Sequence, residues 1–220
     1  MKLTNNLYFY PERGMMDCNT YVITGNPGLI IDPGNPAYLS AKVDTLRKDG
    51  IDPADIHIIA NTHLHIDHCS SNEAFKKLSR ARIALHPVQK ENYQLVVIEG
   101  ARIFGIEPGE FKEDYCLDRD RLSTGEVELD IIEAPGHSPD CVCFYDRQDK
   151  ILICGDVLFE MSTGRVDLPG GNGDVLKKSI ESLSNLDIEY LLPGHMGIVT
   201  GTENVVRNFD FIKGNVFPWL

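Results

Sequence analysis

The sequence predicts a fold of the mixed α/β class, with α+β as its close variant, on three observations. Short apolar segments bounded by Gly, Pro, Asn and Asp alternate with longer amphipathic segments along the chain, which is typical of strands and helices packed in layers. Five of the apolar segments end shortly before a His or an Asp. The 220 residues, 42% of them hydrophobic, suffice for an ample core, so a single domain over residues 1–220 is expected.

Five strands and three helices are expected in the first half of the chain. The strands are 7–10, 20–23, 29–31, 56–60 and 83–85. The helices are 40–48, 69–79 and 88–98. We expect Ser40 to cap the first helix and Gly50 to stop it. The second helix should bury one side, formed by Ala74, Phe75 and Leu78. Residues 99–116 are consistent with either a lid or a plain connection.

The second half of the chain is expected to contain a similar mixture of strands and helices. Its strands are 127–132, 142–145, 151–154 and 190–192, and the polar turn 146–150 pairs the middle two. Its helices are 175–186 and a final one that begins at Thr202 or Glu203 and ends at Lys213. The buried side of the final helix is expected to hold Val205, Val206, Phe209 and Ile212. The role of the loop Gly164 to Gly171 is left open.

Composition excludes several classes of protein. A net charge of −12 argues against nucleic acid or an anionic membrane as the main partner. There is no apolar run of 18 residues and no N-terminal signal pattern, so a cytoplasmic location is the expectation. None of the six Cys forms a Cys-x-x-Cys pair, and Cys141 and Cys143 are too close to bridge easily. Reduced, mostly buried thiols are therefore expected.

The segment Thr62 to His68 gathers three His and one Asp within six residues. In an extended chain His63, His65 and Asp67 would point the same way and could converge on one point. His68 joins them only if the backbone turns, and Asp67 before a helix-like sequence would provide the turn. Imidazole and carboxylate are ligands of zinc and iron. The alternative is a polar turn that happens to hold several His, and the density of the cluster favours a metal.

Each of five expected strands runs into a polar residue or cluster. These are Asp32, the cluster His63 to His68, His137, Asp156 and His195. If the strands share an orientation, the polar ends meet along one rim, where open α/β sheets bind ligands. The alternative for each is an ordinary strand-to-loop transition, but five together favour the shared rim. Gly precedes His137, Asp156 and His195, which allows tight turns beside a ligand.

These residues resemble the metallo-β-lactamase superfamily, since His63-x-His65-x-Asp67-His68 followed by His137, Asp156 and His195 matches its ligand series. The resemblance implies a four-layer αββα sandwich, with helices outside two packed sheets and the metals at one rim. It implies a first metal on His63, His65 and His137. It implies a second on Asp67, His68 and His195, with Asp156 bridging. Two divalent ions, zinc with iron or manganese as alternatives, are the expected cofactors.

Within the superfamily the chain looks like the glyoxalase II branch and its short relatives. The supporting motifs are the segments 155–159 and 164–171. Glyoxalase II carries a further helical domain, whereas 25 residues follow His195 here (195 to 220). Its loop after the bridging Asp also places a Lys and a Tyr near the thiol cofactor, where this chain has Arg165 and Asp167. The thiol carrier is thus left open.

The activity implied is hydrolysis of a thioester or related ester of a small molecule, as in hydroxyacylglutathione hydrolases. A metal-bridged hydroxide, formed because metals lower the pKa of water to about 7, would attack the carbonyl. The expected catalytic residues are Asp67, Asp32 and Arg165. Asp32 would accept the free N–H of a ligand His or merely form an Asp-Pro-Gly turn. Arg165 would bind a substrate anion or pair with Asp167.

Other His and polar residues near the motifs are expected to have lesser roles. Ser138 and Asp140 either orient His137 or form a turn. His57, inside an apolar strand, is expected to be structural. His86 is unassigned because the ligand set is complete without it.

A different class of enzyme is the main alternative: a mononuclear iron dioxygenase that oxidises a persulfide. Such relatives in the same superfamily keep one metal site, and their Gly-Arg-Thr-Asp loop resembles 164–167 here. A lactonase or another ester hydrolase, and a non-catalytic metal-binding protein, are further alternatives. The sequence leaves the oligomeric state open, a homodimer included.

Overall fold

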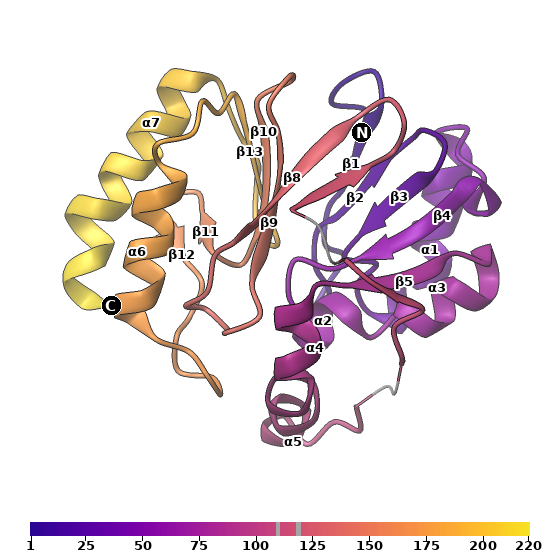
Figure 1. Cartoon of the computed structure of the whole chain (residues 1–220), viewed down its shortest axis with the longest axis horizontal. Coiled ribbons are helices and arrows are strands. Elements are labelled where there is room, and N and C mark those ends of the chain that lie inside the picture. Colours follow the sequence, from indigo (N-terminus) through magenta and orange to yellow (C-terminus); the bar gives the residue numbers. More distant parts are fainter. Residues whose placement is uncertain (109–110, 118–119) are drawn as a thin grey trace.

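The fold is a sandwich of four layers, with helices on the outer faces of two packed β-sheets (Figure 1). The computed structural model describes residues 1–108, 111–117 and 120–220. Part of the segment 99–116, for which a lid was considered, therefore lies outside the described residues. The predicted class and the predicted four-layer architecture are both confirmed.

The first sheet has six strands in the order of the chain. Strands β1 to β3 pair antiparallel, whereas β3, β4, β5 and β6 run parallel. The strands are β1 (Leu7–Tyr10), β2 (Thr20–Ile23), β3 (Gly28–Ile31), β4 (Ile56–Ala60), β5 (Arg82–Leu85) and β6 (Tyr115–Cys116).

The second sheet also has six strands, in the order β14-β13-β10-β9-β8-β7. They are β7 (Arg121–Ser123), β8 (Glu128–Glu133), β9 (Val142–Asp146), β10 (Ile151–Gly155), β13 (Tyr190–Pro193) and β14 (Val199–Thr200). The predicted pairing of 142–145 with 151–154 is confirmed, since β9 and β10 are antiparallel neighbours. A separate hairpin joins β11 (Leu158–Phe159) to β12 (Ser162–Thr163).

The helices form the two outer layers and one projecting segment. In Figure 1, α1 and α3 flank the first sheet, α6 and α7 flank the second, and α2, α4 and α5 lie at one end of the sandwich. The helices are α1 (Pro36–Lys48), α2 (Ile66–Cys69), α3 (Asn72–Ser79), α4 (Pro87–Tyr93), α5 (Gly100–Ile103), α6 (Gly173–Leu183) and α7 (Thr202–Phe211). Helical turns of other types are η1 (Pro53–Asp55), η2 (Gln94–Glu99), η3 (Ile212–Val216) and η4 (Phe217–Trp219).

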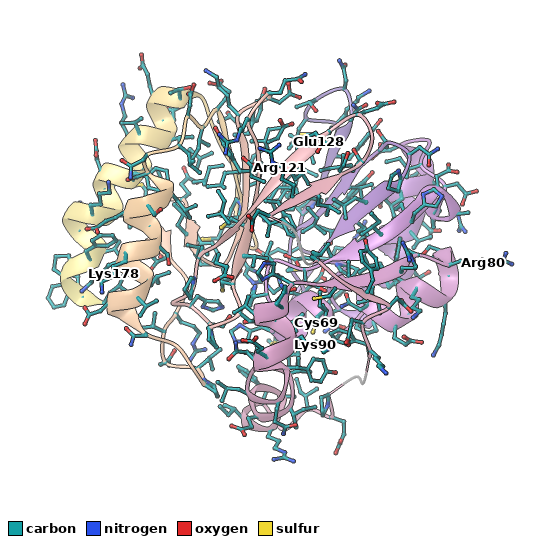
Figure 2. All side chains as sticks on the ribbon, viewed as in Figure 1. Cys69, Arg80, Lys90, Arg121, Glu128 and Lys178 are labelled. Atoms are coloured by element: carbon teal, nitrogen blue, oxygen red, sulfur yellow. The ribbon has the colours of Figure 1, made fainter. Side chains whose placement is uncertain are left out.

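Continuous apolar strands are required because both faces of each sheet are covered. Along β2, Tyr21 and Ile23 face the core between the sheets, while Val22 faces the outer helices. In β9, Phe144 faces the other sheet and Cys143 faces α6 and α7. Successive side chains of a strand point to opposite faces, so a strand covered on both sides is apolar along most of its length. Side chains fill the layers between the ribbons, and Arg80 projects outward (Figure 2).

Several predicted helix boundaries are wrong; α6, for example, ends at Leu183 and not at residue 186. Helix α1 begins at Pro36, one turn before Ser40, because the side chain of Asn35 accepts a hydrogen bond from the amide of Ala37 and Pro36 occupies the first helical position. The helix predicted for 69–79 is two helices, α2 and α3, separated at residues 70–71. The predicted end of α1 is confirmed, since Gly50 takes a positive φ of 80° directly after the cap.

Two predicted core residues are exposed instead. Leu78 is 48% exposed and Val206 is 52% exposed. Helix α3 buries Phe75 and Ser79, and Leu78 lies between them in sequence but turned toward solvent. The short strands β6, β7, β11, β12 and β14 were not predicted, because two or three residues carry too little periodicity to be recognised.

The cysteines are in the reduced state that the composition predicts. All six are free, and five of them are buried. No helix among the described residues is long and apolar enough to cross a membrane.

The five predicted polar strand ends meet at one edge of the sandwich. Strands β3 and β4 are parallel. In the other sheet, β8 and β10 are both antiparallel to β9, and β13 is parallel to β10. The carboxyl ends of β8, β10 and β13 therefore face the same way, and the contacts described below join them to the ends of β3 and β4.

A buried ion pair holds the segment before β2 against α1. The ammonium of Lys42, 1% exposed, lies 3.3 Å from Asp17 Oδ1 and donates to Thr20 Oγ1 at 2.6 Å and to the carbonyl of Pro33 at 3.2 Å. Thr20 in turn donates to the carbonyl of Asp32 at 2.6 Å. The pair thereby supports the backbone that presents Asp32.

Replacing Lys42 with Met should lower the free energy of unfolding by about 3 kcal/mol, because the Asp17 carboxylate would stay buried without its cation. Urea unfolding followed by circular dichroism measures the change. Lys48→Met, in the same helix but exposed, is the matched control and should change the free energy by less than about 0.5 kcal/mol. Equal effects of the two substitutions would contradict the assigned role of the pair.

Candidate metal centre

The histidine cluster begins in an extended segment and continues into a helix. His65 is extended, with φ −63° and ψ 148°, and α2 starts directly after it. His63 and His65 therefore lie before the turn, as predicted, but Asp67 lies in the first helical turn together with His68. The prediction that Asp67 shares an extended face with His63 and His65 is wrong, because the helix begins one residue earlier than Asp67.

Two sets of side chains result from this turn. The first combines His63 and His65 with His137, and His65 Nδ1 lies 2.9 Å from His137 Nε2. The second combines Asp67 and His68 with His195, whose Nε2 lies 3.2 Å from Asp67 Oδ2. Within each set the potential ligand atoms lie within 4.8 Å of one another. The structure thus brings together residues from the ends of β4, β8 and β13.

The carboxylate of Asp156 lies between the two sets. Its Oδ1 is 3.3 Å from His68 Nε2, and its Oδ2 is 3.6 Å from His137 Nε2 and 3.5 Å from His195 Nε2. Asp156 is 8% exposed. One carboxylate therefore faces imidazoles of both sets at once.

The unpaired polar atoms of this region fit a bound cation. His63 Nε2, His68 Nε2 and Asp156 Oδ1 are buried and have no hydrogen-bond partner. A buried polar atom without a partner is destabilising unless something else binds it. Imidazole nitrogens and carboxylate oxygens are the donor set that divalent transition metals prefer. The His and Asp clusters are thus suited to bind divalent metal.

The electrostatics of the two sets differ. Burial lowers the pKa of His63 well below its usual value and lowers the pKa of His65 to about 3. Both imidazoles are therefore neutral, the form that binds metals. Burial would also lower the pKa of His195, but the carboxylates of Asp67 and Asp156 outweigh it and raise the pKa to about 9. The second set is thus rich in negative charge.

Asp32 holds His68, as one of the two sequence interpretations expects. Its Oδ2 lies 3.0 Å from His68 Nδ1 and accepts a hydrogen bond from Thr62 Oγ1 at 2.7 Å, and its Oδ1 accepts from the Thr62 amide at 2.8 Å. Asp32 also has a positive φ of 54°, a conformation that is uncommon for a residue other than glycine. The backbone at residues 32–34 forms no regular turn, so the structure supports the contact with His68 and not the turn.

Two further acceptors were missed by the sequence prediction. Glu12 Oε2 lies 2.8 Å from His195 Nδ1, and Glu12 Oε1 accepts from the Met196 amide at 3.1 Å. The carbonyl oxygen of Arg165 lies 2.6 Å from His137 Nδ1. No local pattern could reveal Glu12, since 183 positions separate it from His195, and a backbone carbonyl has no sequence signal.

Other residues singled out in the sequence have structural contacts. Asp140 Oδ2 accepts from the Leu64 amide at 2.8 Å and its Oδ1 accepts from Ser138, so this pair fixes the backbone between His63 and His65. Burial raises the pKa of Asp140 to about 6. The two histidines outside the centre bind backbone: His57 Nδ1 accepts from the amide of Gly28, and His86 caps α4.

Arg165 forms the ion pair that was considered as the alternative to substrate binding. Its Nε and its terminal nitrogen donate to the two carboxylate oxygens of Asp167 at 2.6 and 2.7 Å. A guanidinium engaged in this two-bond pair has fewer donors left for a substrate anion. The side chain still borders the pocket described next.

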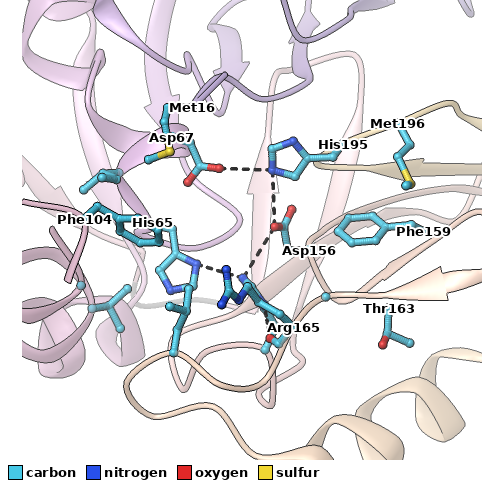
Figure 3. Close-up of a pocket in the computed structure, with 16 residues that line it drawn as sticks. Met16, His65, Asp67, Phe104, Asp156, Phe159, Thr163, Arg165, His195 and Met196 are labelled. Atoms are coloured by element: carbon cyan, nitrogen blue, oxygen red, sulfur yellow. Dashed lines mark hydrogen bonds and ion pairs between the residues drawn. The ribbon is translucent and has the colours of Figure 1, made fainter. Parts of the chain in front are cut away.

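A pocket of about 410 Å³ opens over the two sets, a size typical of small-molecule sites. His65, Asp67, Asp156 and His195 face one another at its floor (Figure 3). Most other described lining residues are apolar: Met16, Ile66, Val96, Phe104, Phe159, Leu168 and Met196. Side chains from both sets therefore lie at the floor of a pocket whose walls are mostly apolar.

Gly194 is required by the close packing of the centre. A Cβ there would lie 2.2 Å from Asp156 Oδ1 and 2.7 Å from His68 Cε1.

Gly194→Ala should therefore lower the free energy of unfolding by about 1–3 kcal/mol, because the added methyl overpacks the site. In Gly197→Ala the methyl would meet only Glu160 Oε2, at 3.8 Å, and we expect less than about 0.5 kcal/mol. Urea unfolding compares the two, and an unchanged stability of Gly194→Ala would refute the packing argument.

The chain is similar to several known proteins. An acyl-coenzyme A thioesterase of Gallus gallus is 29% identical over 213 residues, which cover 86% of this chain and 76% of the relative. The crystal structure of BLEG-1, a B3 metallo-beta-lactamase, has a TM-score of 0.80 and 28% identity and covers 94% of this chain and 100% of that one. The structure of TTHA1623 in a di-iron-bound form has a TM-score of 0.75 and 27% identity, covering 90% and 98%.

The family model of the metallo-beta-lactamase superfamily matches residues 13–195. This range is most of the chain and ends at His195, the last member of the two sets. Fold, clustered His and Asp residues, and family match agree, and the protein belongs to the metallo-beta-lactamase superfamily of metallo-hydrolases.

Proposed function

We propose that the protein is a binuclear metal-dependent hydrolase that cleaves a thioester or related ester of a small molecule, in a glyoxalase II-like branch of the superfamily. The observation that carries the proposal is the position of Asp156, whose two oxygens lie 3.3 Å from His68 and 3.6 Å from His137. A carboxylate that faces both sets can bind two cations at once and lower their mutual repulsion. The thioesterase relative supports the type of bond.

The ligand assignment follows the two sets, with His63, His65 and His137 for one metal and Asp67, His68 and His195 for the other. Asp156 would bridge them. Zinc suits these donors best, and iron and manganese suit them too; the di-iron-bound structural neighbour supports a centre of two metals. When bound, such cations supply a water-derived nucleophile at neutral pH and polarise the scissile carbonyl.

The residues around the ligands would set the tautomers. Asp32, Glu12 and the carbonyl of Arg165 each lie within hydrogen-bonding distance of an Nδ1 atom, on His68, His195 and His137. An imidazole that donates its Nδ1–H in this way presents an unprotonated Nε2 toward the centre. These acceptors therefore orient three imidazoles toward the centre. His195, whose pKa of about 9 keeps it protonated at neutral pH without metal, would release its Nε2 proton when a metal binds.

The apolar enclosure would position the substrate. Phe104 and Met16 lie on the side of His65 and Asp67, and Phe159 lies beside Asp156 and His195 (Figure 3). Apolar walls limit the water around the scissile bond, which strengthens the electrostatic interactions at the reacting carbonyl. Arg165 contributes its carbonyl to His137 and its side chain to Asp167, so we propose a structural role for it.

Metal analysis and a panel of small thioesters, esters and lactones test the proposal. We expect two divalent ions per chain after purification without added metal, and hydrolysis of a thioester. Asp156→Asn should reduce the content to one ion or fewer and lower kcat/KM at least about 100-fold, because the shared ligand is weakened. His57→Asn is the matched control, since His57 lies outside both sets, and should leave both values unchanged.

Two outcomes would contradict the proposal. One is a chain loaded with two metals that hydrolyses no member of the panel. The other is one iron per chain with oxygen uptake on a persulfide, which would favour the dioxygenase alternative. Mass spectrometry of bound metals and an oxygen electrode distinguish them.

Glu12 should affect metal binding without being a ligand. Glu12→Gln keeps an acceptor near His195 but removes the charge, so the metal affinity of the second site should fall about 10–100-fold. Competition with a chromophoric chelator measures this affinity in the absence of substrate. Glu160 is an exposed carboxylate outside both sets, so Glu160→Gln should leave the affinity unchanged. Equal affinities of the Glu12 variant and the parent would exclude this role.

A further inference from the structure

One wall of the pocket has no part in the ligand assignment. It comes from the segment after α4, where η2 is a π-helical turn and α5 follows without a break. Val96, Gly100 and Phe104 of this segment line the pocket. They are spaced four residues apart, so they lie about one turn from each other along the helical segment. Turns of the π type occur often at functional sites.

Gly100 leaves an opening in this wall. It is buried and helical, with φ −57° and ψ −47°, so no special backbone conformation requires a glycine. An added Cβ would meet no heavy atom within 4 Å beyond the local helix. Glycine in a helix is unfavourable by roughly 0.5–1 kcal/mol relative to alanine. A buried helical glycine beside open space is thus explained neither by backbone nor by packing.

The wall faces a second segment that was also unassigned. Leu168 of the loop 164–171 lines the same pocket, and a Cβ at Gly170 would lie 3.1 Å from Leu95 Cδ2. The loop and η2 therefore touch. Together they close one end of an apolar space that is continuous with the floor of His and Asp residues.

The charges around the pocket indicate what this space can hold. Among the described lining residues Arg165 is the one Lys or Arg, and Asp167 engages its guanidinium with two bonds. The floor carboxylates Asp67 and Asp156 are metal ligands under the proposed function, so the cations would offset their charge. The wall itself has no charged side chain, and an uncharged apolar group is matched to it.

We propose that the wall of Val96, Gly100 and Phe104 binds an apolar acyl chain, and that Gly100 determines how long a chain the pocket accepts. The inference rests on the proposed function, because the acyl group must end in a thioester or ester at the metal centre. It identifies the substrate class as neutral fatty-acyl esters or thioesters. Phe104, which is 43% exposed, forms the outer end of the wall.

A chain-length series tests the class of substrate. Thioesters of N-acetylcysteamine, a small uncharged thiol, are hydrolysed by the metal-loaded protein with acyl groups from acetyl to dodecanoyl. Each methylene that the wall buries should raise kcat/KM about fourfold, until the space is full. A flat series would overturn the acyl-chain assignment while leaving hydrolysis itself in place.

Substitutions at Gly100 test its role. In Gly100→Leu the ratio of kcat/KM for the decanoyl over the acetyl thioester should fall at least about tenfold, because the side chain fills the space; Gly100→Ala should give a smaller fall. Gly214→Leu is the matched control, since Gly214 is also helical and a Cβ there meets nothing within 4 Å. It should leave the ratio unchanged. An unchanged ratio in folded Gly100→Leu would overturn the role of Gly100.

A binding experiment separates this inference from the proposed function. Calorimetry with S-alkyl thioethers of N-acetylcysteamine, which cannot be hydrolysed, should show affinity that rises with alkyl length and falls in Gly100→Leu. If affinity rises with alkyl length but no thioester is cleaved, the proposed hydrolase function is wrong and the acyl-chain assignment of the wall stands. If thioesters are cleaved but all alkyl lengths bind equally, the acyl-chain assignment is wrong and the proposed function stands. Gly100→Ala serves both assays should the leucine variant not fold.

Discussion

The structure depends on one buried carboxylate held between imidazoles from both halves of the chain. Asp156 directly follows β10 of the second sheet. Its oxygens face His68, in helix α2 after the first sheet's β4, and His137 and His195, which follow β8 and β13 of the second sheet. Such a group is stable in the interior only if positive charge lies close to it. The centre therefore requires the two sheets to pack with their strand ends aligned, and the apolar core between them provides this alignment.

The interior on either side of this centre is built to keep the ligands still. Asp140 fixes the backbone between His63 and His65, and the Lys42–Asp17 pair supports the backbone at Asp32. Each of these polar groups is buried and satisfied. Rigid supports of this kind reduce the reorganisation needed when a ligand binds. The polar network thus extends from the floor of the pocket to helix α1.

Much of this could be predicted from the sequence, for reasons that particular residues illustrate. Strands β1, β2 and β4 have their predicted bounds because mostly apolar runs are typical of strands that are covered on both faces. The ligand candidates follow from short spacings near strand ends. Asp67 was misplaced, because the start of α2 is set by tertiary packing and not by a capping signal. Glu12 could not be found, since its partner His195 is remote in sequence.

The sequence reveals the metal ligands of the pocket but not its apolar wall, because the two parts restrict their residues to different degrees. Ligand residues must present particular atoms, so their types and spacings are restricted and recognisable. The wall needs only apolar volume. The segments η2 and α5 and the loop 164–171 supply it with side chains such as Val96 and Leu168. Val and Leu are common in any protein core, so they give no signal of a site. A substitution there alters the space without touching a ligand atom. Substrate choice can therefore change on this fold while the metal centre stays the same, and the open face of Gly100 is where such a change meets the least steric resistance.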